Sequence, residues 1–132
     1  MYVPNGYGTV FPYMIVSDAV RFVDFLRKGL DADEIGRTVL PDGRLANVRM
    51  RIGSSCFMVS EAMDDKMPAM PAAYYVYVED VERMLDKAVS NGATKMFGPT
   101  DMPYQDRQAG ITDPFGNIWW ISHRLVEAGY DD

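Results

Sequence analysis

The chain has one cysteine and one histidine among its 132 residues, Cys56 and His123. A single cysteine permits no internal disulfide and fits a reducing compartment, so we expect a cytoplasmic protein. A single histidine excludes a two-histidine metal site within the chain and leaves no defensible Ser-His-Asp triad. No histidine or lysine neighbours Cys56 in the sequence, so a catalytic thiolate is not expected.

Positive charge and long apolar runs are also scarce. Thirteen basic residues face 19 acidic ones, which gives a net charge of −6 and argues against nucleic-acid or anionic-membrane partners. No apolar run approaches the roughly 20 residues of a membrane span. The first basic residue is Arg21, so no charged region opens a signal peptide. With 48% hydrophobic and 24% charged residues, we expect one globular domain over residues 1–132.

An internal repeat organises the sequence. A short apolar run ends at Asp18 and a similar run ends at Asp80, 62 residues later. Each aspartate is a natural helix N-cap, as is Ser17. Apolar residues then follow at the spacing of one helix face. They are Ala19, Phe22, Val23 and Leu26 in the first copy and Val81, Met84, Leu85, Ala88 and Val89 in the second.

Three strand-like segments follow each predicted helix. They cover about residues 34–40, 44–52 and 56–60, and about residues 94–97, 107–112 and 118–122. The patterns predict an α+β fold of two βαβββ modules, at about residues 10–60 and 74–123. A linker rich in Met and Pro, residues 61–73, joins them. The tail after His123 is expected to be frayed.

One turn carries most of the family information. Asp113-Pro114-Phe115-Gly116-Asn117 forms a tight turn before an aromatic strand. This hairpin resembles the last hairpin of the vicinal oxygen chelate superfamily, which holds glyoxalases, extradiol dioxygenases and bleomycin-resistance proteins. The likeness extends from about Val10 to His123. Further segments are most similar to the PhnB-like branch: Pro99–Met102, Asp106-Arg107, Pro41–Gly43 and Ile52-Gly53.

The resemblance implies that the two modules form a curved mixed-sheet cup, with each helix outside its own sheet, and that the protein is a homodimer. Strand alternation assigns the faces. Asn47, Arg49 and Arg51 are expected to face the cup or solvent, and Val48, Met50 and Ile52 are expected under the helix. By the same count, Trp120 faces the cup and Trp119 packs under the helix.

Metal-dependent relatives carry ligands at positions that correspond here to Phe11, Ala73, Trp120 and about Met58, with Phe57 or Val59 as neighbouring choices. PhnB-like relatives often have a His and a Glu on the third strand of the first module, and the equivalent positions here hold Asn47 and Arg49. Divalent metals need imidazole nitrogen or carboxylate oxygen, so we expect no metal and no cofactor.

The aromatic residues of the cup suggest a small-molecule site instead. Trp120 and Arg49 are expected to clamp a planar or anionic group by stacking and hydrogen bonding. Several of the aromatics can equally be ordinary core residues. The predicted ligand-binding residues are Phe11, Tyr13, Asn47, Arg49, Tyr75, Tyr77, Arg107, Gln108 and Trp120.

Three functions therefore remain open. The first is a metal-free binding protein of the glyoxalase/bleomycin-resistance type, which sequesters a planar or anionic compound. The second is a metal-dependent lyase, isomerase or dioxygenase with donors among Glu34, Glu61, Asp106 and His123. The third is an interaction module whose cup is filled by side chains.

Overall fold

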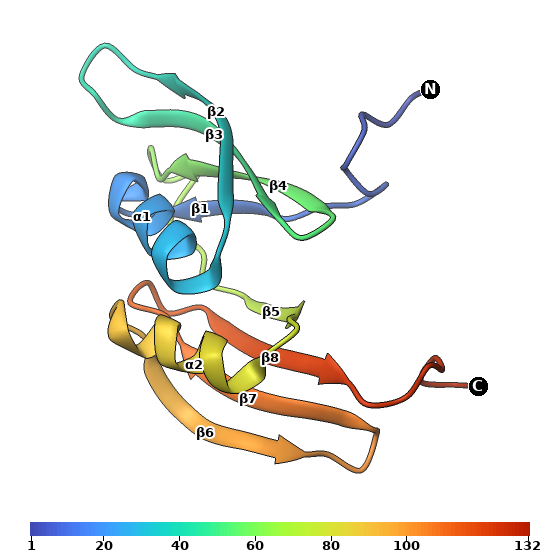
Figure 1. The fold of residues 1–132 in the computed structure, drawn as a ribbon. Helices are drawn as coiled ribbons and strands as arrows, with labels where there is room; N and C mark the ends of the chain where they lie inside the picture. Colours follow the sequence, from blue (N-terminus) through green and yellow to red (C-terminus); the bar gives the residue numbers. More distant parts are fainter. The chain divides into compact units, whose positions relative to one another are not determined.

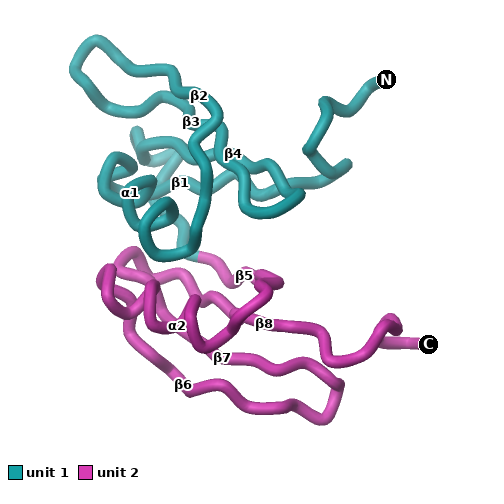
Figure 2. The backbone as a smooth tube through the Cα atoms, viewed as in Figure 1, with its two compact units in different colours: residues 1–71 teal, residues 72–132 magenta.

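The computed structural model describes residues 1–132, which form two compact units, Met1–Pro71 and Ala72–Asp132 (Figure 2). Each unit has one helix and one four-stranded mixed sheet, so the prediction of two βαβββ modules is confirmed. Neither helix has the length and apolar character needed to cross a membrane.

The first unit follows the order β1, α1, β2, β3, β4 (Figure 1). Its sheet has the strand order β1-β4-β3-β2, with β1 parallel to β4 and the other pairs antiparallel. The bounds are β1 Tyr13–Val16, α1 Ala19–Leu30, β2 Asp33–Val39, β3 Leu45–Ile52 and β4 Ser55–Glu61.

The second unit repeats this plan with the strand order β5-β8-β7-β6. Its edge strand β6 runs to Asp101 rather than stopping near Phe97 as expected. Register shifts on either side of Phe97 let the strand continue past Pro99, because a bulge or an edge position tolerates a residue without an N–H. The bounds are β5 Ala73–Tyr77, α2 Val81–Ser90, β6 Thr94–Asp101, β7 Asp106–Thr112 and β8 Ile118–Arg124.

Each helix buries its apolar stripe against its own sheet, as the spacing predicts. Val48 and Met50 are fully buried, which confirms their place on the helix side of the first sheet. Asp80 caps α2 through a bond of 3.0 Å from the Arg83 N–H. The face of each sheet away from its helix is called the helix-free face below.

The start of α1 has a second cap that the sequence did not reveal. Asp18 accepts a bond from the Arg21 N–H at 3.4 Å. Glu61, at the end of β4, accepts from the N–H groups of Asp18 and Ala19 at 2.8 and 3.0 Å. The first N–H groups of a helix have no partner within the helix, so a carboxylate at this position stabilises its start.

The Asp113 turn fixes the beginning of β8. The buried Asp113 carboxylate accepts bonds from the N–H groups of Phe115 and Asn117, the Asn117 amide and the Trp119 indole, all between 2.8 and 3.0 Å. Gly116 closes the turn with a φ of 89°, which a side chain would disfavour. Trp119 is 3% exposed and packs on the Tyr74 ring at 4.8 Å, so its predicted burial on the helix side is confirmed.

The expectation that the C-terminal tail is frayed is wrong. The Leu125 N–H donates to the Gln105 carbonyl at 2.9 Å. Arg124 donates to the carbonyl oxygens of Ala128 and Gly129, both at 2.9 Å. Its guanidinium also lies 4.2 Å from the centre of the Tyr130 ring. One arginine with five N–H groups therefore holds a tail that has no helix or strand of its own.

Candidate functional site

The helix-free face of the second sheet gathers most of the candidate residues of that unit. Residues directly opposite each other on neighbouring strands share a face. Tyr75 lies opposite Trp120, and Tyr77 lies opposite Ser122, which in turn lies opposite Gln108. The structure thus brings Tyr75, Tyr77, Gln108 and Trp120 to one face, and Trp120 points away from the helix as predicted.

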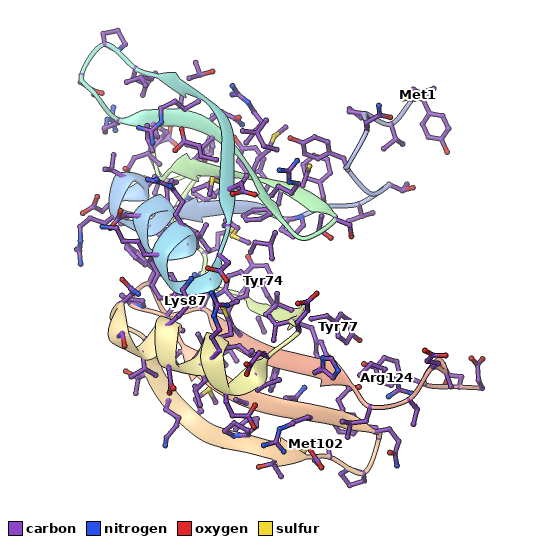
Figure 3. The ribbon with its side chains drawn as sticks, viewed as in Figure 1. Met1, Tyr74, Tyr77, Lys87, Met102 and Arg124 are labelled. Carbon is purple, nitrogen blue, oxygen red and sulfur yellow. The ribbon has the colours of Figure 1, made fainter.

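Four tyrosines on this face surround a hollow of about 360 Å³. They are Tyr75, Tyr77, Tyr104 and Tyr130, and we call this group the tyrosine hollow. Each ring remains between 43 and 54% exposed. The rings of Tyr75 and Tyr77 are 5.3 Å apart, and Trp120 lies 6.5 Å from Tyr75. Figure 3 shows Tyr77 on β5 and Arg124 near the end of β8. The hollow therefore offers aromatic faces within stacking distance of one another.

Asp106 provides a buried acceptor beside the hollow. Its carboxylate is fully buried and accepts bonds from the phenols of Tyr75 and Tyr130 and from Nη1 of Arg124. Burial alone would raise the pKa of Asp106, but the bonds from Tyr130, Tyr75 and Arg124 together hold it below its ordinary value. Asp106 is therefore a fixed anion that can only accept hydrogen bonds.

The two phenols respond in the opposite direction. Burial raises the pKa of Tyr75 and of Tyr130, and the bond that each phenol donates to Asp106 raises it further. Both phenols therefore stay protonated at neutral pH and remain donors. The Tyr130 hydroxyl also contacts the Tyr77 hydroxyl, which joins three of the four rings through one chain of polar atoms.

Gln108 orients the fourth ring. It is buried, donates to the Ser122 hydroxyl at 2.8 Å and accepts from the Tyr104 phenol at 2.6 Å. Both ends of the Gln108 amide are thus engaged with neighbouring side chains. Its place beside the hollow agrees with the sequence analysis, but its contacts are those of a residue that positions Tyr104.

Phe97 extends the aromatic face in a way that the sequence pattern does not reveal. A Cβ atom added to Gly110 would lie 2.4 Å from the Phe97 ring. Gly110 lies opposite Trp120 on the neighbouring strand. The ring of Phe97 therefore occupies the space that a side chain at position 110 would fill, on the face that carries Trp120.

Arg107 does not belong to this face, and its expected place beside Gln108 is wrong. Consecutive residues of a strand point to opposite sides of the sheet. Arg107 is ion-paired with Glu82 of α2, with an Nε to Oε1 distance of 2.8 Å, and with Asp101 at 3.0 Å. These pairs hold Arg107 on the helix side, away from the tyrosine hollow.

The first unit carries a smaller polar group on its own helix-free face. Tyr13 and Arg49 both lie opposite Met58 of β4. Nη1 of Arg49 donates to the Asn47 side-chain oxygen at 3.1 Å and to the Thr38 hydroxyl at 3.2 Å. Because these acceptors are neutral, they orient the guanidinium without cancelling its charge. Phe11 lies just before β1, with its ring 4.7 Å from that of Tyr7.

The residues present do not fit the metal site of metal-dependent relatives. The corresponding positions hold Phe11 and Met58 in the first unit and Ala73 and Trp120 in the second. None of these side chains offers a nitrogen or carboxylate ligand.

The donors named for a displaced metal site are already engaged. Glu61 caps α1 with both oxygens, and Glu34 binds Arg37 through two bonds of 2.7 and 2.6 Å. Asp106 and His123 lie on opposite faces of the second sheet, because Asp106 shares its face with Gln108 and His123 lies opposite Arg107. Nδ1 of His123 is 2.9 Å from the Val78 carbonyl.

Comparison with known protein families gives a match over most of the chain. Residues 9–121 match the model of the Glyoxalase/Bleomycin resistance protein/Dioxygenase superfamily. An uncharacterized protein of Mycobacterium bovis is 30% identical over 135 residues, which cover 92% of this chain and 86% of that protein.

Solved structures give the same fold. TioX from a Micromonospora species aligns with a TM-score of 0.75 and 20% identity, over 89% of this chain and all of that one (100%). TnmS3, described as an antibiotic binding protein from a Streptomyces species, aligns with a TM-score of 0.70 and 19% identity, over 94% of this chain and 98% of that one. At these identities the likeness shows the fold.

Proposed function

The chain belongs to the glyoxalase/bleomycin resistance protein/dioxygenase superfamily, and we propose that it is a metal-free binding protein that sequesters a planar, partly apolar small molecule without turnover. The observation that carries the proposal is the hollow of about 360 Å³ between four partly exposed tyrosine rings. This volume lies at the lower end of the range of small-molecule pockets. The description of TnmS3 as an antibiotic binding protein supports the same class of function.

In this proposal Tyr75, Tyr77 and Trp120 supply stacking surface for the ligand. Gln108 holds Tyr104 in position at the edge of the hollow. Separately, on the first unit, we propose that Arg49 binds an anionic group, because its own hydrogen-bond partners are neutral. Phe11, Tyr13 and Asn47 remain candidate ligand contacts in that unit.

Three further predictions from the sequence remain part of the proposal. They are membership of the PhnB-like branch, a homodimer and a reducing cytoplasmic location. The dimer is tested by sedimentation at tens of micromolar, well above the dissociation constants of typical obligate dimers. A species of 14.9 kDa under those conditions would contradict it.

The binding test uses the two tryptophans as reporters. Trp119→Phe leaves Trp120 as the only tryptophan, and planar aromatic compounds, with and without a carboxylate, are titrated into that protein. We expect saturable quenching, and a dissociation constant about tenfold weaker when Tyr77→Ala is added, because a stacking surface is lost. Tyr2→Ala is the matched control, since Tyr2 is 92% exposed and lies outside the hollow.

Arg49→Ala tests the anion site of the first unit by itself. By calorimetry, carboxylate compounds should bind this variant more weakly than the parent protein, and neutral compounds should bind both proteins equally. Trp120→Ala removes the reporter, so its binding is measured by calorimetry. If folded Tyr77→Ala and Trp120→Ala proteins bind the planar compounds as tightly as the parent protein does, the site is wrongly placed. Elemental analysis of untagged protein tests the metal-free part, and one equivalent of a divalent metal held by side chains would overturn it.

A further inference from the structure

Tyr130 differs from the other members of the tyrosine hollow in where it comes from. Tyr75, Tyr77 and Tyr104 lie on or next to strands of the sheet, whereas Tyr130 belongs to the tail after β8. The tail is attached to the sheet through Arg124, through a bond from the Leu125 N–H to the Gln105 carbonyl and through the Tyr130 phenol. Tyr130 therefore enters the hollow on a segment without strand pairing, and such a segment exchanges with another group at a lower cost than a strand of the sheet does.

Asp106 is the point at which the tail closes the hollow. Oδ2 of the buried carboxylate accepts from the Tyr75 phenol and from the Tyr130 phenol, while Oδ1 accepts from Arg124 at 3.1 Å. Tyr75 is fixed in β5. Oδ2 of Asp106 thus accepts one bond from a residue of the sheet, Tyr75, and one bond from the tail, which the Tyr130 hydroxyl donates.

We propose that the position taken by the Tyr130 phenol is a recognition site for the phenolic hydroxyl of a planar aromatic ligand, which displaces Tyr130 on binding. This inference rests on the proposed function and names its ligand class. The chain's own phenol shows which geometry Asp106 accepts in this position: an aromatic ring in the hollow with its hydroxyl on Oδ2.

The charges of the site select a neutral donor. A carboxylate ligand would place an anion against Asp106, and two carboxylates in contact repel each other. An ammonium ligand would approach Arg124, which is already bound to Asp106. A phenol avoids both conflicts, donates one bond to Oδ2 and keeps its ring for stacking on Tyr77 or Tyr75.

The test compares 2-naphthol with 2-methoxynaphthalene, which share the planar rings and differ in the hydroxyl hydrogen. Each probe is titrated by calorimetry into the parent protein, Tyr130→Ala, Tyr130→Phe and Tyr2→Ala. We expect Tyr130→Ala to bind 2-naphthol about tenfold more tightly than the parent does, because the competing phenol is gone. Tyr130→Phe should also bind 2-naphthol more tightly than the parent does. Its gain should be smaller than that of Tyr130→Ala, since the Phe ring still enters the hollow. 2-Methoxynaphthalene should bind more weakly than 2-naphthol to Tyr130→Ala, and Tyr2→Ala should match the parent.

The outcomes separate this inference from the proposed function. Equal affinity of Tyr130→Ala for the two probes would refute recognition of the hydroxyl and leave the binding proposal standing. Unchanged affinity for 2-naphthol in both Tyr130 variants would refute displacement of the tail. Failure of both probes to bind any of the proteins would contradict both proposals. If Tyr130→Ala does not fold, as judged by circular dichroism, Tyr130→Phe decides the question alone.

Discussion

Replacing Asp113 with alanine should destabilise the protein more than any other change at a turn of this chain. The Asp113 carboxylate is 4% exposed and accepts four hydrogen bonds. Asn117 and Trp119, which supply three of the four donors, are 2 and 3% exposed. Water therefore cannot easily replace the lost acceptor, and each buried donor left unpaired costs about 1–3 kcal/mol.

From these contacts we expect Asp113→Ala to lower the free energy of unfolding by about 3–5 kcal/mol. Asp113→Asn should cost about 2–3 kcal/mol, because its NH₂ group would face the donors of Asn117 and Trp119 while the other oxygen keeps its partners. The assay is urea unfolding followed by tryptophan fluorescence and circular dichroism. Asp64→Ala is the control, since exposed Asp64 accepts only backbone bonds within its own turn, and it should cost a small fraction of this amount.

A double-mutant cycle tests the physical reason directly. In Asp113→Asn, the new NH₂ group faces the indole N–H of Trp119, and both are donors. Trp119→Phe removes that indole donor. The two changes together should therefore cost about 1 kcal/mol less than the sum of the single changes. If the costs simply add, or if Asp113→Ala costs no more than Asp64→Ala, the turn is not held by this carboxylate and the reasoning is refuted.

Three other predictions concern a helix cap, a close contact and the phenols of Tyr75 and Tyr130. Glu61→Ala should lower the free energy of unfolding by about 1–2 kcal/mol in urea unfolding, because α1 loses the acceptor of two of its first N–H groups; a loss no larger than that of a surface glutamate would contradict the cap. Gly110→Ala should cost about 1–3 kcal/mol, since a Cβ there would meet the aromatic ring packed over it at 2.4 Å; Gly98→Ala, whose added Cβ would have nothing within 4 Å, is the control and should be nearly neutral. Tyr130 and Tyr75 have pKa values raised in the folded state by burial and by their acceptor carboxylate, so their contribution to stability is complete below the ordinary tyrosine pKa of about 10 and is lost as the pH rises above it. Ultraviolet titration of phenolate should show one late-ionising phenol fewer in Tyr130→Phe than in the parent protein. An unchanged titration would contradict the assignment.

Much of the fold follows from local patterns. The aspartates 62 residues apart, the helical spacing after each of them and the three strand-like segments that follow predict both modules. Strand alternation also separates Trp119 from Trp120, because each strand places consecutive side chains on opposite faces. Applied to Arg107 and Gln108, the same rule would have placed Arg107 on the helix side, where its partner Glu82 lies.

The parts of the candidate site that escaped prediction depend on contacts between distant residues. Asp106 and Tyr130 are far apart in sequence, and the tail that carries Tyr130 has no periodicity to indicate burial. The insertion of Phe97 over Gly110 depends on a register shift in β6. The second cap of α1 likewise depends on a distant contact, because Glu61 at the end of β4 reaches the start of α1 only when β4 pairs with β1.

The proposal of a small-molecule site in the tyrosine hollow is tested most directly by NMR with tyrosine rings labelled by ¹³C. The chain has eight tyrosines, and each ring signal can be assigned by its own Tyr→Phe variant. During titration with 2-naphthol, the signals of Tyr75, Tyr77, Tyr104 and Tyr130 should shift along one saturable curve with a single dissociation constant. The signals of Tyr2, at the exposed N-terminus, and Tyr74, packed on Trp119, should stay in place. Shifts of Tyr2 or Tyr74 that match those of the hollow, or no saturable shift of the four hollow tyrosines, would contradict the account.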